Sequence, residues 1–211
     1  MSYTRYPSRN ARKNYFPVPN QVMELQLPWK ELAVYLYLIH QYRNPCKTDF
    51  NYPRMVCDVF GFSDQMARKL LNNLYAKGLY SIVGSMIFPK HCFEKWEQWP
   101  EKFFPLPKEL FALELGTGEI VLYAYLLYRE NRDTFDCLVS RSRLQEVMGM
   151  SSNTVAKCVR LLEKKMFIET ERTTYTRRNG EPMNGPLRFR ILPIEGAKAK
   201  LCEMQIGDVC G

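Results

Sequence analysis

The alternation of hydrophobic and polar residues is most regular over 140–165, where it predicts two short helices joined by a tight turn. Ser140 is a good N-cap for the first helix, and Gly149 is suited to ending it. Ser151 then caps the second helix. The inner face of the first helix comprises Leu144, Val147 and Met148. The inner face of the second comprises Val155, Cys158, Val159, Leu162 and Met166.

The opposite face of the second helix is polar and basic. It carries, at helical spacing, Asn153, Lys157, Arg160 and Lys164. Ser152 and Thr154 lie beside Asn153 at the start of the same helix. Arginine and lysine contact phosphates and guanine edges, and asparagine can pair with adenine, so the stripe is typical of a helix that reads the major groove. A solvated face on a helical bundle has the same pattern, so the stripe alone does not distinguish a DNA-reading helix from a solvated one.

A hairpin is predicted directly after this helix. Residues 167–175 are rich in β-branched and aromatic side chains, and Asn179-Gly180 is a strong two-residue turn signal. The return strand is expected over 186–192, where apolar residues alternate with arginines. The hairpin contributes four basic candidates, Arg172, Arg177, Arg178 and Arg188.

A helix-turn-helix followed by such a hairpin is the pattern of a winged helix. Residues 141–190 hold eleven Lys and Arg against five Asp and Glu, which favours a nucleic-acid-binding surface. A winged helix that binds no nucleic acid remains the alternative.

The chain also repeats itself with an offset of 88 residues. The segment 15–44 resembles 102–131, with Pro17 matching Pro105 and Tyr35 matching Tyr123. The same offset continues through Gly61 and Gly149. In each repeat an extended Phe-Pro-x-Pro segment precedes a largely apolar helix, expected over 29–42 and 118–131. The tyrosines of these helices are predicted to be core residues.

The two repeats differ where DNA would be read. Further helices are expected over 53–60 and 63–77 in the first repeat, followed by a short hairpin over 79–88. The polar positions corresponding to the basic stripe are Gln65, Lys69 and Asn72, and Arg68 lies next to them. Their charge is lower, and the short hairpin is apolar. The first repeat is therefore predicted to bind DNA weakly or to serve as a docking face.

These patterns predict an α+β fold, mainly helical with small β-wings, in which two winged helix-turn-helix domains follow one another. The expected organisation is a basic flexible arm (1–14), a first unit with a short wing (15–90), a linker (91–101), a second unit with a long basic wing (102–194) and a C-terminal tail (195–211).

Composition narrows the class of partner and the cellular compartment. The 211 residues carry a net charge of +8 and a pI near 9.1, which favours a polyanionic partner. Seven scattered cysteines form no metal-ligand or disulfide pattern, so they are expected to be reduced and the protein cytoplasmic. The N-terminus does not look like a signal peptide, and no apolar run is long enough to cross a membrane.

Motifs that would indicate catalysis are missing from the sequence. It contains no phosphate-binding glycine loop of the Walker type, no Gly-x-Ser-x-Gly and no His-Glu-x-x-His. The two histidines, His40 and His91, have no metal-ligand spacing around them. We therefore expect no enzymatic activity, no metal and no cofactor.

The second repeat resembles the N-terminal winged-helix domain of the plasmid replication initiator A family, found on mobile elements of Gram-positive bacteria. The residues that carry the resemblance are FFPLPKELF, EIVLYAYLLYREN and SRSRLQEVMGMSSNTVAKCVRLLEKKMFIE, followed by the basic hairpin. The resemblance implies binding of double-stranded DNA. It also implies that the recognition positions are Ser152, Asn153, Thr154, Lys157 and Arg160. This chain differs from the family in repeating the unit.

The leading expectation is a sequence-specific protein that binds double-stranded DNA, acting as a transcriptional regulator. One alternative is a replication initiator of a plasmid or conjugative element. Another is a protein-interaction scaffold built from tandem winged helices. Partners other than DNA would be a second copy of the chain or replication and transcription proteins.

Overall fold

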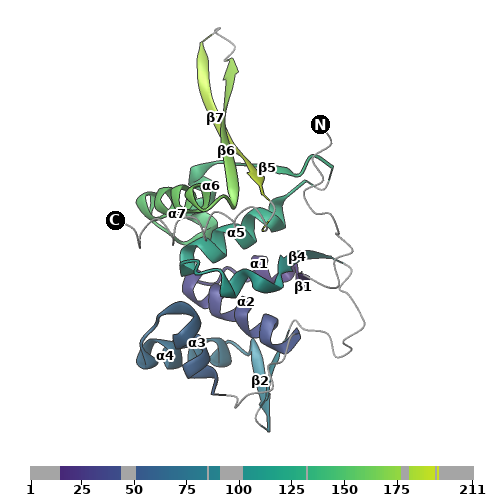
Figure 1. Cartoon of the computed structure of the whole chain (residues 1–211), viewed down its shortest axis with the longest axis vertical. Helices are drawn as coiled ribbons and strands as arrows, with labels where there is room; N and C mark the ends of the chain where they lie inside the picture. Colours follow the sequence, from purple (N-terminus) through teal and green to yellow (C-terminus); the bar gives the residue numbers. More distant parts are fainter. Residues whose placement is uncertain are drawn as a thin grey trace, which may run out of the picture. The chain divides into compact units, whose positions relative to one another are not determined.

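A computed structural model describes residues 15–43, 51–84, 86–90, 102–131, 133–176, 181–192 and 194 (Figure 1). The expected basic arm, most of the expected linker and the C-terminal tail lie outside these residues, as do Arg177 and Arg178. The described part is α+β, with helices and small antiparallel sheets. Among the described residues, no helix combines the length and hydrophobicity needed to cross a membrane.

The first repeat contains three short strands and four helices among its described residues. In chain order they are β1 (Tyr15–Pro19), α1 (Gln21–Glu24), α2 (Trp29–Arg43), α3 (Tyr52–Phe60), α4 (Asp64–Ala76), β2 (Tyr80–Val83) and β3 (Met86–Pro89). Helices α2, α3 and α4 begin and end within two residues of where the sequence predicts them, whereas α1 was not predicted.

The second repeat has the same order of elements, with one strand added. The elements are β4 (Phe103–Pro107), η1 (Lys108–Ala112), α5 (Thr117–Arg129), β5 (Asp136–Val139), α6 (Arg141–Met148), α7 (Ser152–Lys164), β6 (Ile168–Thr176) and β7 (Pro182–Ile191). Strand β5 was not expected from the sequence. Strand β7 begins at Pro182, four residues before the predicted start at Pro186.

The same backbone turns recur 88 residues apart. Gln26 and Glu114 have φ of 49° and 50°, and Gly61 and Gly149 have φ of 66° and 60°. Side chains other than glycine rarely adopt positive φ, so the match at Gln26 and Glu114 reflects one local backbone path used twice. The described elements therefore repeat with the sequence offset, down to the ends of individual helices.

The predicted helix caps are present. Ser140 Oγ accepts a hydrogen bond from the Arg143 N–H at 3.1 Å. Ser151 Oγ accepts one from the Thr154 N–H at 3.2 Å. Gly149 ends α6 in the left-handed conformation, with its N–H donating to the Gln145 carbonyl. The turn between α6 and α7 is thus fixed by local chemistry at both ends.

A two-stranded ribbon joins β1 to β4. The strands are antiparallel, and Pro17 lies opposite Pro105, its equivalent in the repeat. Sequence patterning predicted both segments to be extended but gave no sign that they pair with each other.

The chain divides into two compact units, and the boundary falls between Val121 and Leu122, inside α5. This lies 20 residues after the end of the expected linker at 91–101. The boundary is displaced from the linker because residues after the linker contact the first unit. Strand β4 pairs with β1, and the ring centroid of Phe111 lies 5.2 Å from that of Tyr37 and 5.1 Å from that of His40. The start of the second repeat thus belongs to the first compact unit.

The central helix of each repeat is buried, as predicted. Residues 31–39 of α2 and 118–127 of α5 are all buried, including the four tyrosines expected in the core. Glu31 is a buried carboxylate at 5% exposure, and it accepts hydrogen bonds from Asn73 Nδ2 at 3.0 Å and from Lys77 Nζ. These partners compensate for the loss of water around its charge.

The second compact unit holds a three-stranded sheet of order β5-β7-β6. Strand β5 pairs only with the root of β7, from Leu187 to Arg190. Beyond that point β6 and β7 continue as a two-stranded hairpin, which projects past α6 and α7 (Figure 1). The extra strand therefore anchors the hairpin at its root.

Candidate nucleic-acid interface

Helix α7 divides into a buried face and an exposed face. Val155, Cys158, Val159 and Leu162 are buried, as the sequence predicts. Met166 is only half-buried and lies beyond the helix, with φ of 59°, so its assignment to the inner helical face was wrong. The helix ends at Lys164, and the chain turns there towards β6.

The predicted stripe on α7 is exposed along its whole length. Asn153, Lys157, Arg160 and Lys164 all face solvent. Within the described part of the chain, none of the three cations forms an ion pair with a carboxylate. Their charges are therefore available to an anionic partner.

The N-terminal end of α7 presents Ser152 and Asn153 to solvent. Thr154 differs from them, because its side chain is half-buried and its hydroxyl lies 2.8 Å from Ser151 Oγ in a hydrogen bond. Thr154 thus belongs to the helix cap, and Asn153 is the side chain best placed to contact a base edge.

The arginines of the hairpin fall into two groups. Arg188 lies 3.2 Å from Glu171 and 3.5 Å from Asp136, and Arg190 lies 3.6 Å from Glu169. Arg188 was a candidate for phosphate contact, but these carboxylates offset its charge. Arg172 is exposed and forms no ion pair with a described residue, so it remains a strong candidate.

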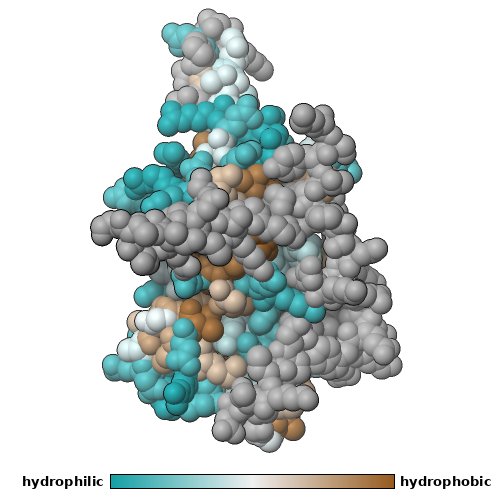
Figure 2. Space-filling view, in the orientation of Figure 1, coloured by the Kyte–Doolittle hydropathy of each residue, from teal (hydrophilic) through white to brown (hydrophobic). Residues whose placement is uncertain are grey.

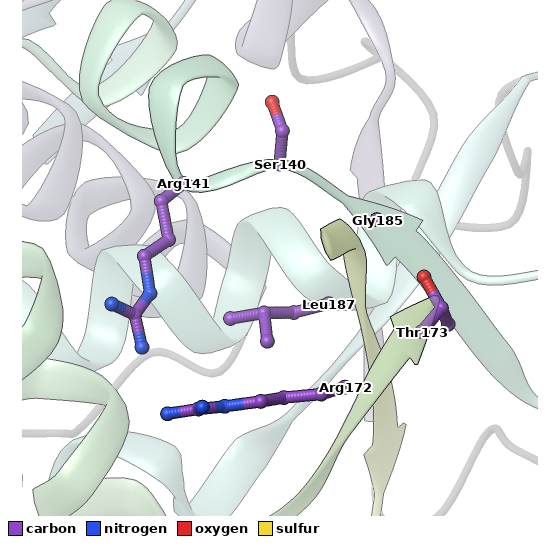
Figure 3. Close-up of a pocket in the computed structure, with 6 residues that line it drawn as sticks. All are labelled: Ser140, Arg141, Arg172, Thr173, Gly185 and Leu187. Atoms are coloured by element: carbon purple, nitrogen blue, oxygen red, sulfur yellow. The ribbon is translucent and has the colours of Figure 1, made fainter. Parts of the chain in front are cut away.

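A cleft of about 300 Å³ opens between the start of α6 and the root of the hairpin (Figure 3). It is lined by Ser140, Arg141, Arg172, Thr173, Gly185 and Leu187. Figure 3 shows the guanidinium groups of Arg141 and Arg172 extending beside Leu187, one from α6 and the other from β6. Sequence reasoning missed Arg141. The available signal was its place at the first position of a helix, directly after a serine cap.

A β-bulge shapes the wall of this cleft. Arg172 pairs with Leu187 and Thr174 with Asn184, so Gly185 and Pro186 together oppose Thr173. Thr173 Oγ1 donates to the Pro186 carbonyl at 2.6 Å, which ties the bulge across the two strands. A Cβ on Gly185 would lie 2.3 Å from Thr173 Oγ1, so no larger residue fits there without a shift.

The corresponding surface of the first repeat is less basic. Gln65, Lys69 and Asn72 on α4 are exposed, but Arg68 is bound by Asp64, whose Oδ2 lies 2.6 Å from Arg68 Nε. This hydrogen bond to Asp64 raises the pKa of Arg68. Asp64 occupies the position of Ser152, so α4 starts with a carboxylate where α7 starts with a hydroxyl.

Hydrophobic side chains are exposed next to α4. Tyr75 at the end of the helix is 58% exposed, and Ile82 and Val83 on β2 are 57% and 64% exposed. Figure 2 shows, in contrast, hydrophilic side chains over α6 and α7 and around the root of the long hairpin. The two repeats thus present surfaces of different chemistry.

Within the described residues, no group of three or more His, Cys, Asp or Glu side chains is placed to hold a metal ion. Among the described residues, Cys57, Cys137 and Cys158 are not part of a disulfide.

Comparison with known proteins gives no assignment. No protein-family model matches the chain, and no curated protein matches it.

Proposed function

We propose that the chain binds double-stranded DNA, with the second repeat acting as a winged helix-turn-helix module. Helix α7 would lie in the major groove and the β6–β7 hairpin would lie along the backbone as the wing. The observation that carries this proposal is the exposed stripe of α7, where three cations without ion pairs follow Asn153 at the start of the helix.

The physical argument is one of shape and charge. An α-helix fits the major groove, and residues near its N-terminus reach base edges in helix-turn-helix proteins. Asn153 would read a base, while Arg160 and Lys164, further along, would contact phosphates. A long hairpin anchored by β5 extends the same basic surface through Arg172. Phosphate contacts of this kind fix the register and give most of the affinity.

In this proposal the protein is a transcriptional regulator. The alternative of a replication initiator involves the same DNA surface, together with repeated sites at an origin and contacts to replication proteins. Mapping the bound sites on the genetic element that encodes the chain separates the two. Sites in promoters support a regulator, and an array of repeats at an origin supports an initiator.

The exposed residues of the first repeat favour a second function beside DNA binding. Tyr75, Ile82 and Val83 provide apolar surface next to a helix whose arginine is neutralised by Asp64. Such a surface is more typical of protein contact than of phosphate contact. A scaffold role for the whole chain would be supported if no DNA affinity were found.

The test is binding to duplex DNA as a function of salt, after selection of preferred sequences from a random pool. If about five cations engage phosphates, log K should fall against log salt with a slope of about −4 to −5. The described candidates are Lys157, Arg160, Lys164, Arg172 and Arg141. On the selected site, Asn153→Ala should relax preference at one base and weaken binding by about 1–3 kcal/mol. Binding that does not change with salt would contradict the proposal.

A further inference from the structure

The cleft between α6 and the hairpin brings together two arginines that are distant in sequence. Arg141 comes from the first position of α6, and Arg172 from the middle of β6. None of the six described residues that line the cleft is acidic. Two guanidinium groups therefore face one open space, and no carboxylate lies in its wall.

In the described part of the chain, other arginines near the cleft are paired with carboxylates, unlike Arg141 and Arg172. Arg188 and Arg190 on β7 both lie within ion-pair distance of glutamates on β6. Arg143, two residues after Arg141, is bound by Glu146 at 2.8 Å, and this hydrogen bond raises its pKa. Arg141 and Arg172 have no such partner among the described residues. Like charges at one cleft repel each other, and a bound anion would relieve that repulsion.

The wall of the cleft is held in place by the surrounding structure. Thr173 is tied to the Pro186 carbonyl, and Ser140 is tied to the Arg143 N–H. The first turn of α6 also opens here, and a helix start is favourable for negative charge. A guanidinium group presents a planar fork of N–H donors, which matches the oxygens of a phosphate. The geometry thus suits a compact oxyanion better than a flat or apolar ligand.

We propose that this cleft binds one phosphate group, with Arg141 and Arg172 donating hydrogen bonds to its oxygens from two sides. This inference rests on the proposed function, in which the phosphate is a phosphodiester of the DNA backbone. A phosphate on a small molecule has the same chemistry, so the experiment treats the two sources separately.

The DNA arm compares Arg141→Ala, Arg172→Ala and the double variant with Arg143→Ala. Arg143→Ala removes the same charge from the same helix, but from a residue already paired with Glu146, so it is the matched control. The double variant should weaken duplex binding about tenfold or more and reduce the salt slope by about 1, because one phosphate contact is lost. The two single variants should be non-additive, since both act on that one phosphate. Arg143→Ala should change the slope little.

The second arm uses inorganic phosphate alone, at constant ionic strength against chloride. The Nε–Hε resonances of Arg141 and Arg172 in the full chain should shift together as phosphate is added, and those of Arg143 should not. Each single variant should abolish the response of the remaining arginine. Thermal unfolding of every variant checks that the fold is retained, since both side chains are at the surface.

The outcomes separate the site from the proposed function. A response to phosphate together with the DNA effect supports a backbone phosphate. A response to phosphate in a protein without DNA affinity keeps the phosphate site, overturns the DNA source and contradicts the proposed function. A third outcome is that the wild type binds DNA, Arg143→Ala weakens binding as much as the double variant does, and phosphate causes no response. That outcome overturns the site and leaves the proposed function standing.

Discussion

Lys157 on α7 and Lys69 on α4 occupy equivalent positions 88 residues apart, and both side chains are exposed. Their surroundings differ, because Arg160 and Lys164 continue the stripe beyond Lys157, whereas Asn72 and Ala76 follow Lys69. At the scale of single residues, the two repeats therefore differ in surface charge at a few equivalent positions.

We predict that Lys157→Ala weakens DNA binding more than Lys69→Ala does. A cation within a cluster contributes to a phosphate contact that its neighbours help to position, and an isolated cation does not. Both variants remove one exposed lysine from the same helical position, so each is the control for the other. The measurement is affinity for a selected and a scrambled duplex. Equal losses would mean that both repeats contact DNA alike.

His40 gives the second prediction at this scale. Burial lowers the pKa of His40 from 6.5 to about 4, partly opposed by a hydrogen bond to the backbone of Lys108. The folded protein therefore keeps this imidazole neutral between pH 6.5 and 4, whereas the unfolded chain protonates it. The unfolded state binds more protons in this window, so the free energy of unfolding should fall as the pH is lowered. The full effect is on the order of 3 kcal/mol.

The measurement is urea unfolding at pH 7, 5.5 and 4.5 for the wild type and for His40→Gln. Glutamine keeps an N–H donor but does not titrate in this range. The difference in stability between the two proteins should shift in favour of the variant as the pH falls. A difference that is independent of pH would show that the imidazole does not remain neutral.

Elements differ in how much of their structure the sequence determines locally. Helices α4, α6 and α7 were predicted to within two residues because apolar spacing and a serine cap agree at each of them, and α6 also ends at a glycine. Strand β5 was missed because it is only four residues long and because Leu138, on its exposed face, is apolar, so the segment shows no alternation of apolar and polar residues. The early start of β7 was missed because Pro182 and Gly185 look like loop residues.

The candidate site was likewise predictable only in part. The α7 stripe follows from helical periodicity, which sets the outward direction of each side chain. Arg188 is paired with Glu171 across the hairpin and with Asp136, which lies in a strand that was not predicted from the sequence. The cleft depends on residues 141 and 172, which meet only after the sheet has formed. Local patterns thus predict faces of single elements, but not contacts between elements.

At this scale we predict that Gly185→Ala distorts the hairpin. The new methyl group would meet Thr173 Oγ1 at 2.3 Å, and that atom is held by the Pro186 carbonyl. We expect a loss of about 1–3 kcal/mol in stability, as for other overpacked sites. Thermal unfolding and the amide resonances of β6 and β7 would measure it. Thr174→Ala, an exposed change on the same strand, should cost less than Gly185→Ala.

Removal of the obstructing hydroxyl gives a further check. The double variant Gly185→Ala/Thr173→Ala should recover part of the stability lost in Gly185→Ala, even though it also loses the hydrogen bond to Pro186. No recovery at all would show that the clash with Thr173 is not the cause.

At the scale of the whole molecule, sequence repeats and compact units do not coincide. Phe111 belongs to the second repeat by sequence, yet it packs 5.2 Å from Tyr37 and 6.2 Å from Phe60 in the first unit. Strand β4 likewise pairs with β1. The first unit is therefore completed by residues that follow the expected linker.

We predict that Phe111→Ala destabilises the first compact unit by about 2–4 kcal/mol, because a large ring is removed from an aromatic cluster. Hydrogen exchange of the amides at 31–39 should become faster, since α2 carries two of the rings that Phe111 contacts. Lys102→Ala, a change at an exposed side chain just before β4, is the control. Unchanged protection of 31–39 in Phe111→Ala would show that the ring contributes little to the unit.

The pairing of β1 with β4 has a consequence for synthesis of the protein. Strand β1 leaves the ribosome 88 residues before its partner, a delay of roughly 4–18 s at about 5–20 residues per second. During that time Phe16 and Val18, both buried in the finished protein, have no strand to cover them. Pro17 lies between these two residues and Pro19 follows Val18, and neither proline has an N–H that could hydrogen-bond to a strand of another chain. The prolines thus make the unpaired β1 a poor template for aggregation between nascent chains.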